Sequence, residues 1–390
     1  MTTALTAAPA APLRRLGTWR VEEFLARHWQ RQAVCIRQAI AGFSNPVSRT
    51  RLFDLARSAD VESRLVSAFA GRWKVRQGPF ASSALPSLRR AGWTLLVQGV
   101  DLHDSATAAL AARFRFLPAA RFDDVMISYA SDRGGVGPHV DQYDVFLLQG
   151  QGRRRWRIAV DFDPRLIDDM PLRVLANFRH DREWILEPGD LLYLPPGVAH
   201  EGVALDQSIT ISIGFRLPAW QEVAEAWSEH RARVAPRSGR VPDFTRSPTR
   251  TPARLPAAMV DAVVRELRRG APARVEARRT LLEHLSEPKP TVIFNARRRA
   301  IGLPRFVQAA GRRGVAMDLR TRMLYEDGDL AINGELQSVS GATGRLLRCL
   351  ANQGRLSAAA LRSANAREAS GLFSLLHNWY RYGWIHLAGD

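Results

Sequence analysis

The chain has 390 residues, of which 46% are hydrophobic and 24% charged, an ordinary balance for a soluble globular protein. It is too long for one compact core, so we expect two or three domains. No run of eighteen apolar residues occurs, which excludes an obvious membrane-spanning helix.

The formal net charge of +18 would attract polyanions such as RNA, so nucleic acid is a possible partner but not a required one. Lys74 and Lys289 are the only lysines, and an arginine bias of this kind also arises without selection for binding. Cys35 and Cys349 are far apart and unlike a zinc motif. Together these features predict a reducing, cytoplasmic setting without structural disulfides.

Residues 18–30, TWRVEEFLARHWQ, have helical spacing and begin with Thr18 as a predicted N-cap. From about 33 to 215 the pattern changes to short β-rich runs separated by Gly/Pro-rich turns, as in a barrel or sandwich. The clearest of these runs are WTLLVQGV (93–100), DDVMISYA (123–130) and DVFLLQG (144–150).

Residues 219–286 return to helical periodicity, with a Pro/Arg/Ser-rich connector from Pro236 to Pro256. Beyond them we expect short strands near 315–340, the helices GATGRLLRCLANQG and REASGLFSLLHNWYRYG, and a closing strand WIHLA, an order typical of a winged-helix module. The sequence thus predicts a mainly β catalytic domain at 1–217, a helical region at 218–288 and a winged-helix-like domain at 289–390.

The segment from 134 to 158, GGVGPHVDQYDVFLLQGQGRRRWRI, carries the most specific chemistry. On an extended strand His139, Asp141 and Tyr143 leave the same face, so a histidine and a carboxylate can bind one metal ion. A second histidine, His200, follows the turn-rich segment EPGDLLYLPPGVAH.

Two imidazoles and one carboxylate leave open positions on an octahedral ion, the arrangement of non-heme Fe(II) oxygenases. His139, Asp141 and His200 are therefore the predicted iron ligands and catalytic centre. A zinc or manganese cupin, or an unrelated surface His-Asp pair, is the alternative at this point.

An oxygenase of this type must also hold 2-oxoglutarate, whose far carboxylate needs a buried cation. In RRRWRI, Arg154 shares its parity with Trp156 and Ile158, which predicts that it points inward and pairs with that carboxylate. Arg153, Arg155 and Arg157 would then face solvent.

Several segments together resemble the bacterial ribosomal oxygenases of the JmjC class, which hydroxylate an arginine in large-subunit ribosomal protein sixteen. The resemblance covers about 15–217 and rests on SRLVS, GPFASS, MISYASDRGGVGPHVDQYDVFLLQGQGRRRWRI, EPGDLLYLPPGVAHEGVAL and ITISIGFR. It implies a JmjC/cupin double-stranded β-helix, a dimer, and the same four residues as iron ligands and cosubstrate anchor. It also implies a 3-hydroxyarginine product.

A substrate arginine would need a carboxylate for its guanidinium and an apolar wall for its stem. Asp124, Met126 and Ser128 alternate onto one strand face. We predict that Asp124, Met126 and Tyr143 form the substrate pocket, with Ser212 as a weaker member and Ser128 serving the cosubstrate. The alternative is that Met126 belongs to the core and Asp124 caps a turn.

Two other functions fit parts of the pattern. A cupin that senses a metabolite could bind nucleic acid through the winged-helix-like end, although the REASGLFSLLHNWY helix has few cations. A JmjC demethylase would keep the iron site, but the sequence lacks an evident aromatic cage for methyl-lysine. Dimerisation is predicted through 219–286, where Trp220, Val223, Ala224 and Trp227 place apolar surface on one helix face.

Overall fold

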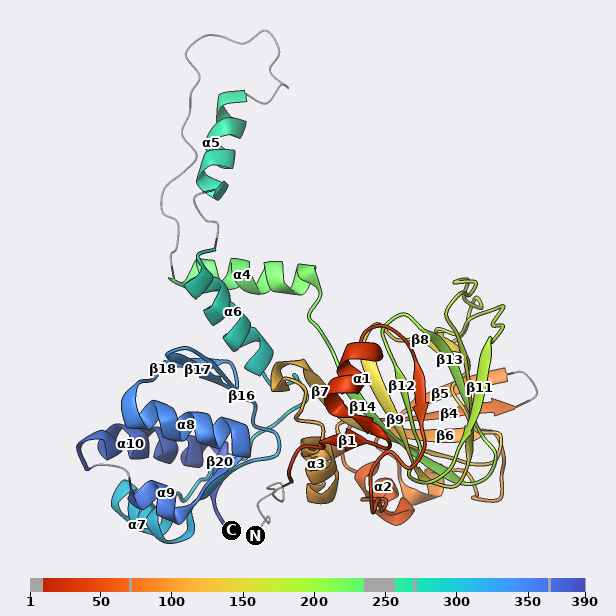
Figure 1. Cartoon of the computed structure of the whole chain (residues 1–390), viewed down its shortest axis with the longest axis horizontal. Coiled ribbons are helices and arrows are strands. Elements are labelled where there is room, and N and C mark those ends of the chain that lie inside the picture. Colours follow the sequence, from red (N-terminus) through yellow and green to blue (C-terminus); the bar gives the residue numbers. More distant parts are fainter. Residues whose placement is uncertain (1–9, 70–71, 235–256, 269–271, 364–365, 390) are drawn as a thin grey trace. The chain divides into compact units, whose positions relative to one another are not determined.

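A computed structural model describes residues 10–69, 72–234, 257–268, 272–363 and 366–389 (Figure 1). It divides the chain into two compact units, one made of 1–217, 288–321 and 341–390, the other of 218–287 and 322–340. The predicted boundary at 217 falls between the two units. That the winged-helix-like region forms a separate domain from residue 289 remains a prediction. The predicted connector Pro236–Pro256 lies outside the described residues. No helix within these ranges is long and apolar enough to cross a membrane.

Two antiparallel sheets form the barrel, as the β-rich pattern predicted. The larger has the order β3 (Val34–Ile36), β12 (Leu191–Leu194), β9 (Asp144–Gln151), β14 (Ser208–Phe215), β7 (Phe122–Ala130), β6 (Trp93–Val97), β4 (Ser63–Phe69) and β5 (Arg72–Gln77). The smaller has the order β11 (Arg182–Leu186), β10 (Arg154–Ala159), β13 (Ala199–Ala204) and β8 (His139–Val140).

The two faces of the large sheet serve different purposes. On β7, Val125, Ile127 and Tyr129 are buried in the main apolar core. Asp124, Met126 and Ser128 alternate with them and therefore face the barrel interior. There, apolar side chains from both sheets, among them Leu147 and Trp156, pack together and hold the sheets face to face.

Short elements cover the outer side of the large sheet. They are β1 (Arg15–Leu16), β2 (Trp19–Arg20), α1 (Val21–Arg27), α2 (Arg49–Leu55), α3 (Ser105–Ala112) and the 3-10 turns Ser82–Ala84, Val100–Leu102 and Ala119–Arg121. The prediction of Thr18 as N-cap was wrong. Trp19 and Arg20 pair with β1 instead, and the helix begins at Val21 with the Glu23 carboxylate accepting from the Arg20 backbone N–H.

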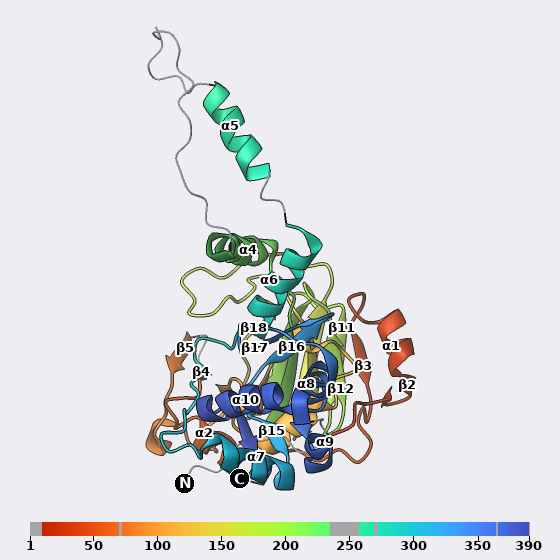
Figure 2. The ribbon, with the colours of Figure 1, turned by 90° about the vertical axis from the view of Figure 1, so that its left-hand side faces the viewer.

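The C-terminal part of the first unit carries a three-stranded sheet of order β19-β15-β20, together with the helices α7 to α10 that Figure 2 labels. Its elements are α7 (Leu303–Arg313), β15 (Val315–Met317), α8 (Gly341–Gln353), β19 (Arg355–Leu356), α9 (Ala358–Arg362), α10 (Ala366–Tyr382) and β20 (Ile385–Leu387). The two predicted helices and the closing strand are thus present, in the winged-helix-like order expected. Trp379 and Tyr380 are buried, which fits packing rather than nucleic-acid contact.

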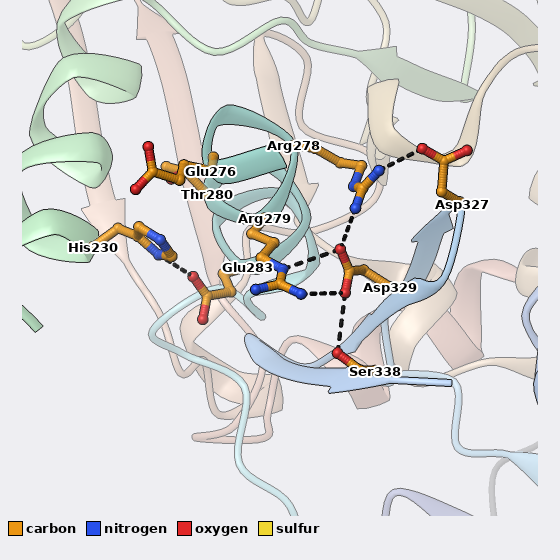
Figure 3. A network of polar contacts seen from close by, with 9 residues as sticks. All are labelled: His230, Glu276, Arg278, Arg279, Thr280, Glu283, Asp327, Asp329 and Ser338. Atoms are coloured by element: carbon orange, nitrogen blue, oxygen red, sulfur yellow. Dashed lines mark hydrogen bonds and ion pairs between the residues drawn. The ribbon is translucent and has the colours of Figure 1, made fainter. Parts of the chain in front are cut away.

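The second unit combines the helical region with a small meander. Its elements are α4 (Trp220–Val234), α5 (Ala257–Arg268), α6 (Arg274–Ser286), β16 (Met323–Glu326), β17 (Asp329–Ile332) and β18 (Glu335–Ser338). Arg278 and Arg279 on α6 bind Asp329 on β17, and His230 on α4 binds Glu283 on α6 (Figure 3). Ion pairs therefore join segments that lie about fifty residues apart in the chain.

Candidate functional site

His139, Asp141 and His200 meet at the β8 edge of the smaller sheet. His139 on β8 and His200 on β13 are direct cross-strand partners, and their ring centroids lie 4.3 Å apart. Asp141 Oδ2 lies 3.9 Å from His139 Nε2 and 3.7 Å from His200 Nε2. One ligand atom from each of the three residues lies within 4.8 Å of the others, which is close enough to hold a single ion.

The strand predicted through His139, Asp141 and Tyr143 is shorter than expected. β8 ends at Val140 in the small sheet and β9 begins at Asp144 in the large one, so residues 141–143 turn between sheets. The backbone N–H of Gly197 donates to the Asp141 carbonyl at 2.8 Å and fixes this turn. Strand parity predicted that His139 and Asp141 lie close together, and they do. Parity does not explain the position of Asp141, however, because this residue lies in the turn after β8.

Both histidine rings are oriented by backbone carbonyls. His139 Nδ1 lies 3.0 Å from the Gly137 carbonyl, and His200 Nδ1 lies 3.0 Å from the Val198 carbonyl. With Nδ1–H as the donor in each ring, Nε2 carries the lone pair that a metal requires. Burial, together with the neighbouring His139, lowers the pKa of His200 and favours its neutral form. This donor set fits the two-histidine, one-carboxylate site of Fe(II) oxygenases.

Arg154 points into the barrel, as the parity of RRRWRI predicted. It is 3% exposed, whereas Arg155 and Arg157 are half-buried and lie near Glu183. The acceptors of its guanidinium in the described ranges are all neutral: Ser128 Oγ at 3.1 Å, Thr210 Oγ1 at 3.3 Å and the Gly202 carbonyl at 3.2 Å.

No carboxylate among the described residues pairs with Arg154, and its Nε has no hydrogen-bond partner there. Burial alone lowers its pKa to about 10, which leaves the group charged at neutral pH. An isolated buried charge is costly unless an anion joins it. The guanidinium therefore fits the far carboxylate of 2-oxoglutarate.

Sequence reasoning missed two of the residues that contact Arg154, Thr210 and Gly202. Thr210 shares the parity of Ser212 on β14, so the alternation could have identified it, and its hydroxyl also donates to Gln149 Oε1 at 3.1 Å. Gly202 gave no such signal. A Cβ there would lie 2.8 Å from Arg154 Nε and 2.7 Å from the Trp156 ring, so the guanidinium requires glycine at this position.

The predicted substrate residues lie on the inner face of the large sheet or next to the triad. Met126 on β7 pairs in register with Ser212 on β14, and both belong to the face that carries Ser128. Tyr143 is half-buried. Burial and the adjacent Asp141 carboxylate raise the pKa of the Tyr143 hydroxyl well above its usual range, so it stays a neutral hydrogen-bonding group.

Asp124, which was predicted to bind the substrate guanidinium, already has partners within the chain. It is 4% exposed, and its Oδ2 accepts from Gln98 Nε2 at 2.7 Å and from Lys289 Nζ at 2.8 Å. The ammonium of Lys289 also lies 3.0 Å from Asp123 Oδ1. The alternative of a turn cap is excluded, because Asp124 lies within β7. A cation of the chain itself already occupies this carboxylate.

The JmjC domain family model matches residues 109–223. A second model, the AraC-like ligand binding domain, matches 178–285. The first range contains all three predicted metal ligands and Arg154.

Among curated proteins, the chain is 43% identical over 215 residues to an Escherichia coli protein named ribosomal protein uL16 3-hydroxylase. It is 36% identical over 208 residues to a Haemophilus influenzae protein named probable ribosomal oxygenase. The first alignment covers 53% of this chain and 56% of the relative, and the second covers 50% of each. The chain thus spans about half the length of the curated relatives it matches.

The solved structures extend the likeness over almost the whole chain. An X-ray structure of E. coli ycfD is 30% identical, with a TM-score of 0.86, and the match covers 96% of this chain and 100% of that one. A structure of the same ribosomal oxygenase in complex with cobalt and 2-oxoglutarate has a TM-score of 0.82 and 30% identity, with 95% of this chain and 99% of that one covered.

Proposed function

This chain belongs to the JmjC-type ribosomal oxygenases, and on that premise we propose that it is an Fe(II)- and 2-oxoglutarate-dependent hydroxylase of a ribosomal protein. One observation carries the proposal. A buried guanidinium without a carboxylate partner among the described residues lies in the same barrel as a His-Asp-His cluster. A metal site beside an unmatched buried cation suits a cosubstrate that both chelates metal and carries a second negative charge.

In this proposal each side chain has a defined task. His139, Asp141 and His200 hold the iron, and the carbonyls of Gly137 and Val198 fix the two rings. Arg154 binds the far carboxylate of 2-oxoglutarate, with Ser128 and Thr210 orienting its guanidinium. When bound, iron and 2-oxoglutarate supply the oxidising chemistry for hydroxylation of an unactivated C–H bond. The barrel positions the substrate and excludes water.

The substrate we propose is an arginine of the large-subunit ribosomal protein uL16, hydroxylated at carbon 3. This ribosomal protein appears in the name of the E. coli relative. The residues suited to bind it are Asp124, Met126, Tyr143 and Ser212. The net charge of +18 repels a basic ribosomal protein at long range, so recognition must depend on local acidic groups.

The decisive experiment compares the masses of ribosomal proteins from cells with and without this gene. One oxygen atom should be lost from a single protein in the deletion strain. An assay with purified enzyme then identifies the type of side chain that is hydroxylated. An arginine peptide should be oxidised far better than its lysine analogue, because lysine lacks the planar guanidinium with its parallel N–H donors. Asp124→Asn should reduce peptide oxidation more than peptide-independent 2-oxoglutarate turnover. Equal oxidation of the two peptides would reject the arginine pocket and leave the iron site intact.

We also propose a cytoplasmic homodimer that associates through the helical region. Trp220 on α4 is 89% exposed, and Val260, Val263 and Val264 on α5 are exposed. Large apolar groups on helix surfaces favour association. Sedimentation at micromolar concentration should give a dimer, and a monomer would reject this part of the proposal. RNA binding is not needed for the reaction, and the buried aromatic residues of α10 do not favour it.

A further inference from the structure

Lys289 lies just beyond α6, in a segment that belongs to the same compact unit as the barrel. Its Nζ lies 2.8 Å from Asp124 Oδ2 and 3.0 Å from Asp123 Oδ1, and its side chain is 34% exposed. Burial opposes its charge, but the two carboxylates prevail and raise the pKa of Lys289 above its ordinary value. Lys289 is therefore an ammonium ion at neutral pH.

The carboxylate that Lys289 contacts is the one proposed to bind the substrate guanidinium. Asp124 shares the barrel-facing side of β7 with Met126 and Ser128, and Ser128 contacts Arg154. Lys289 and Gln98 both donate to the Oδ2 atom of Asp124. A second cation close to the same carboxylate would be repelled by the ammonium already present.

Binding of a substrate cation at Asp124 is consequently an exchange. An incoming lysine would replace one ammonium by another and would gain no new type of contact. It would also compete with a group tethered in the same chain, whose effective concentration is high. An incoming arginine offers two parallel N–H donors to the carboxylate, which a single ammonium cannot match.

On the basis of the proposed function, we propose that Lys289 is a specificity-determining residue. It occupies Asp124 in the free enzyme, is displaced by the substrate guanidinium, and thereby excludes substrate lysine. Lys289 and the substrate cation compete for the same carboxylate. Only a substrate group that binds Asp124 more strongly than Lys289 does, such as a bidentate guanidinium, displaces it. The Lys289 ammonium takes no part in the oxidation itself.

The test is Lys289→Met, which removes the charge and keeps most of the side-chain length. The KM for an arginine peptide should fall by about threefold to tenfold, since Asp124 becomes available in every molecule. The KM for the lysine analogue should fall by a larger factor, so that the preference for the arginine peptide narrows. Lys74→Met is the matched control, because Lys74 is the only other lysine and lies exposed on β5. It should leave both KM values unchanged.

Two further variants keep the test decisive if Lys289→Met folds poorly. Lys289→Arg places a guanidinium of the chain itself beside Asp124, where it can bind the carboxylate with two N–H groups. This variant should raise the KM for the arginine peptide, because the competing group is now as strong as the substrate. In an Asp124→Asn background, Lys289→Met should have no effect on KM. A higher or unchanged KM for Lys289→Met in the wild-type background would overturn the inference, since Lys289 would then only support Asp124 or play no part.

Calorimetric titration of the same peptides separates this inference from the proposed reaction. If the wild-type protein binds the arginine peptide but does not oxidise it, the proposed reaction is wrong. The change in Kd for Lys289→Met still decides the role of Lys289 in that case. A Kd that falls for both peptides supports it, and a Kd that stays constant or rises overturns it.

Discussion

Partly or fully buried arginines in two regions of the molecule have different partners. In the second unit, Asp329 Oδ2 accepts from Arg278 at 2.6 Å and from Arg279 at 3.1 Å, while Oδ1 accepts from Arg279 at 3.1 Å and from the Ser338 hydroxyl at 3.2 Å (Figure 3). In the barrel, Arg154 is more deeply buried, and its acceptors among the described residues are two hydroxyls and a carbonyl.

The difference shows how a structural charge can be told from a binding charge. The arginines of α6 find their counterions within the chain, so they join α6 to β17 and need no ligand. Within the part of the chain that the structure describes, Arg154 has only neutral partners. The unfavourable free energy of burying its charge therefore remains to be offset by a bound anion. Arg154 is also the more deeply buried residue, but the kind of partner is what tells a binding charge from a structural one.

The largest expected effect is at the metal cluster. His139→Ala or Asp141→Ala should abolish 2-oxoglutarate turnover, because two remaining ligands hold the ion poorly and in the wrong geometry. Succinate release measures the loss, and an unchanged thermal unfolding transition shows that the variant is folded. Succinate release at the wild-type rate from either variant would show that the cluster is not the catalytic centre.

Arg154 should have the next largest effect. Arg154→Ala should raise the 2-oxoglutarate concentration needed for half-maximal turnover by a factor that corresponds to ~2 to 4 kcal/mol, the usual loss when a buried charge loses its partner. Arg155→Ala, one residue along the same strand, should change it little. Equal effects at the two positions would mean that the cosubstrate lies on the other face of β10.

Asp329→Asn tests the paired region. It should lower the free energy of unfolding by about 2 kcal/mol at pH 7, at the modest end for a buried pair because the Arg279 side chain is 39% exposed. Hydrogen bonding from Arg279 holds the pKa of Asp329 below its usual value, against opposing burial and with further help from Arg278. The stabilisation is therefore complete above the unfolded carboxyl pKa of about 4 and is lost as the pH falls through the lower folded value.

Urea unfolding of wild type and Asp329→Asn across this pH range checks the sign. The gap between them should close as the pH falls, and a gap that widened would contradict the assignment. Turnover of 2-oxoglutarate in the barrel, measured in parallel at pH 7, should be the same in both proteins.

The smallest effect should have the opposite sign. Arg154→Met removes an unmatched buried charge, so it should stabilise the metal-free, cosubstrate-free protein by roughly 1 kcal/mol. Saturating metal and 2-oxoglutarate should reverse the order, since only the wild type gains stability from the ligand. Thermal unfolding with and without both ligands measures the reversal. A variant less stable than the wild type in both conditions would show that the Arg154 charge stabilises the fold, as the arginines paired with Asp329 do.

Several features of the fold and the site followed from local sequence alone. Alternation placed Asp124, Met126 and Ser128 on one face of a strand and Arg154 inside the barrel, because side chains on a strand point to opposite faces in turn. The β-rich and helical regions were also predicted in the right order, since hydrophobic periodicity reports which face of an element is buried.

Other features depended on contacts between distant segments. Asp141 lies near His139 because the chain turns from one sheet to the other after β8. The alternation of side chains along a strand does not predict this position. The sequence by itself determined the types of residue at the site, their inward or outward orientation and the family resemblance. Only the tertiary structure decided that Arg154 has no carboxylate partner among the described residues while Arg279 has one, and that Lys289 reaches Asp124 from 165 residues away. Charge partners are chosen by distance in space, and the sequence carries no local signal for a neighbour that the fold brings in from elsewhere.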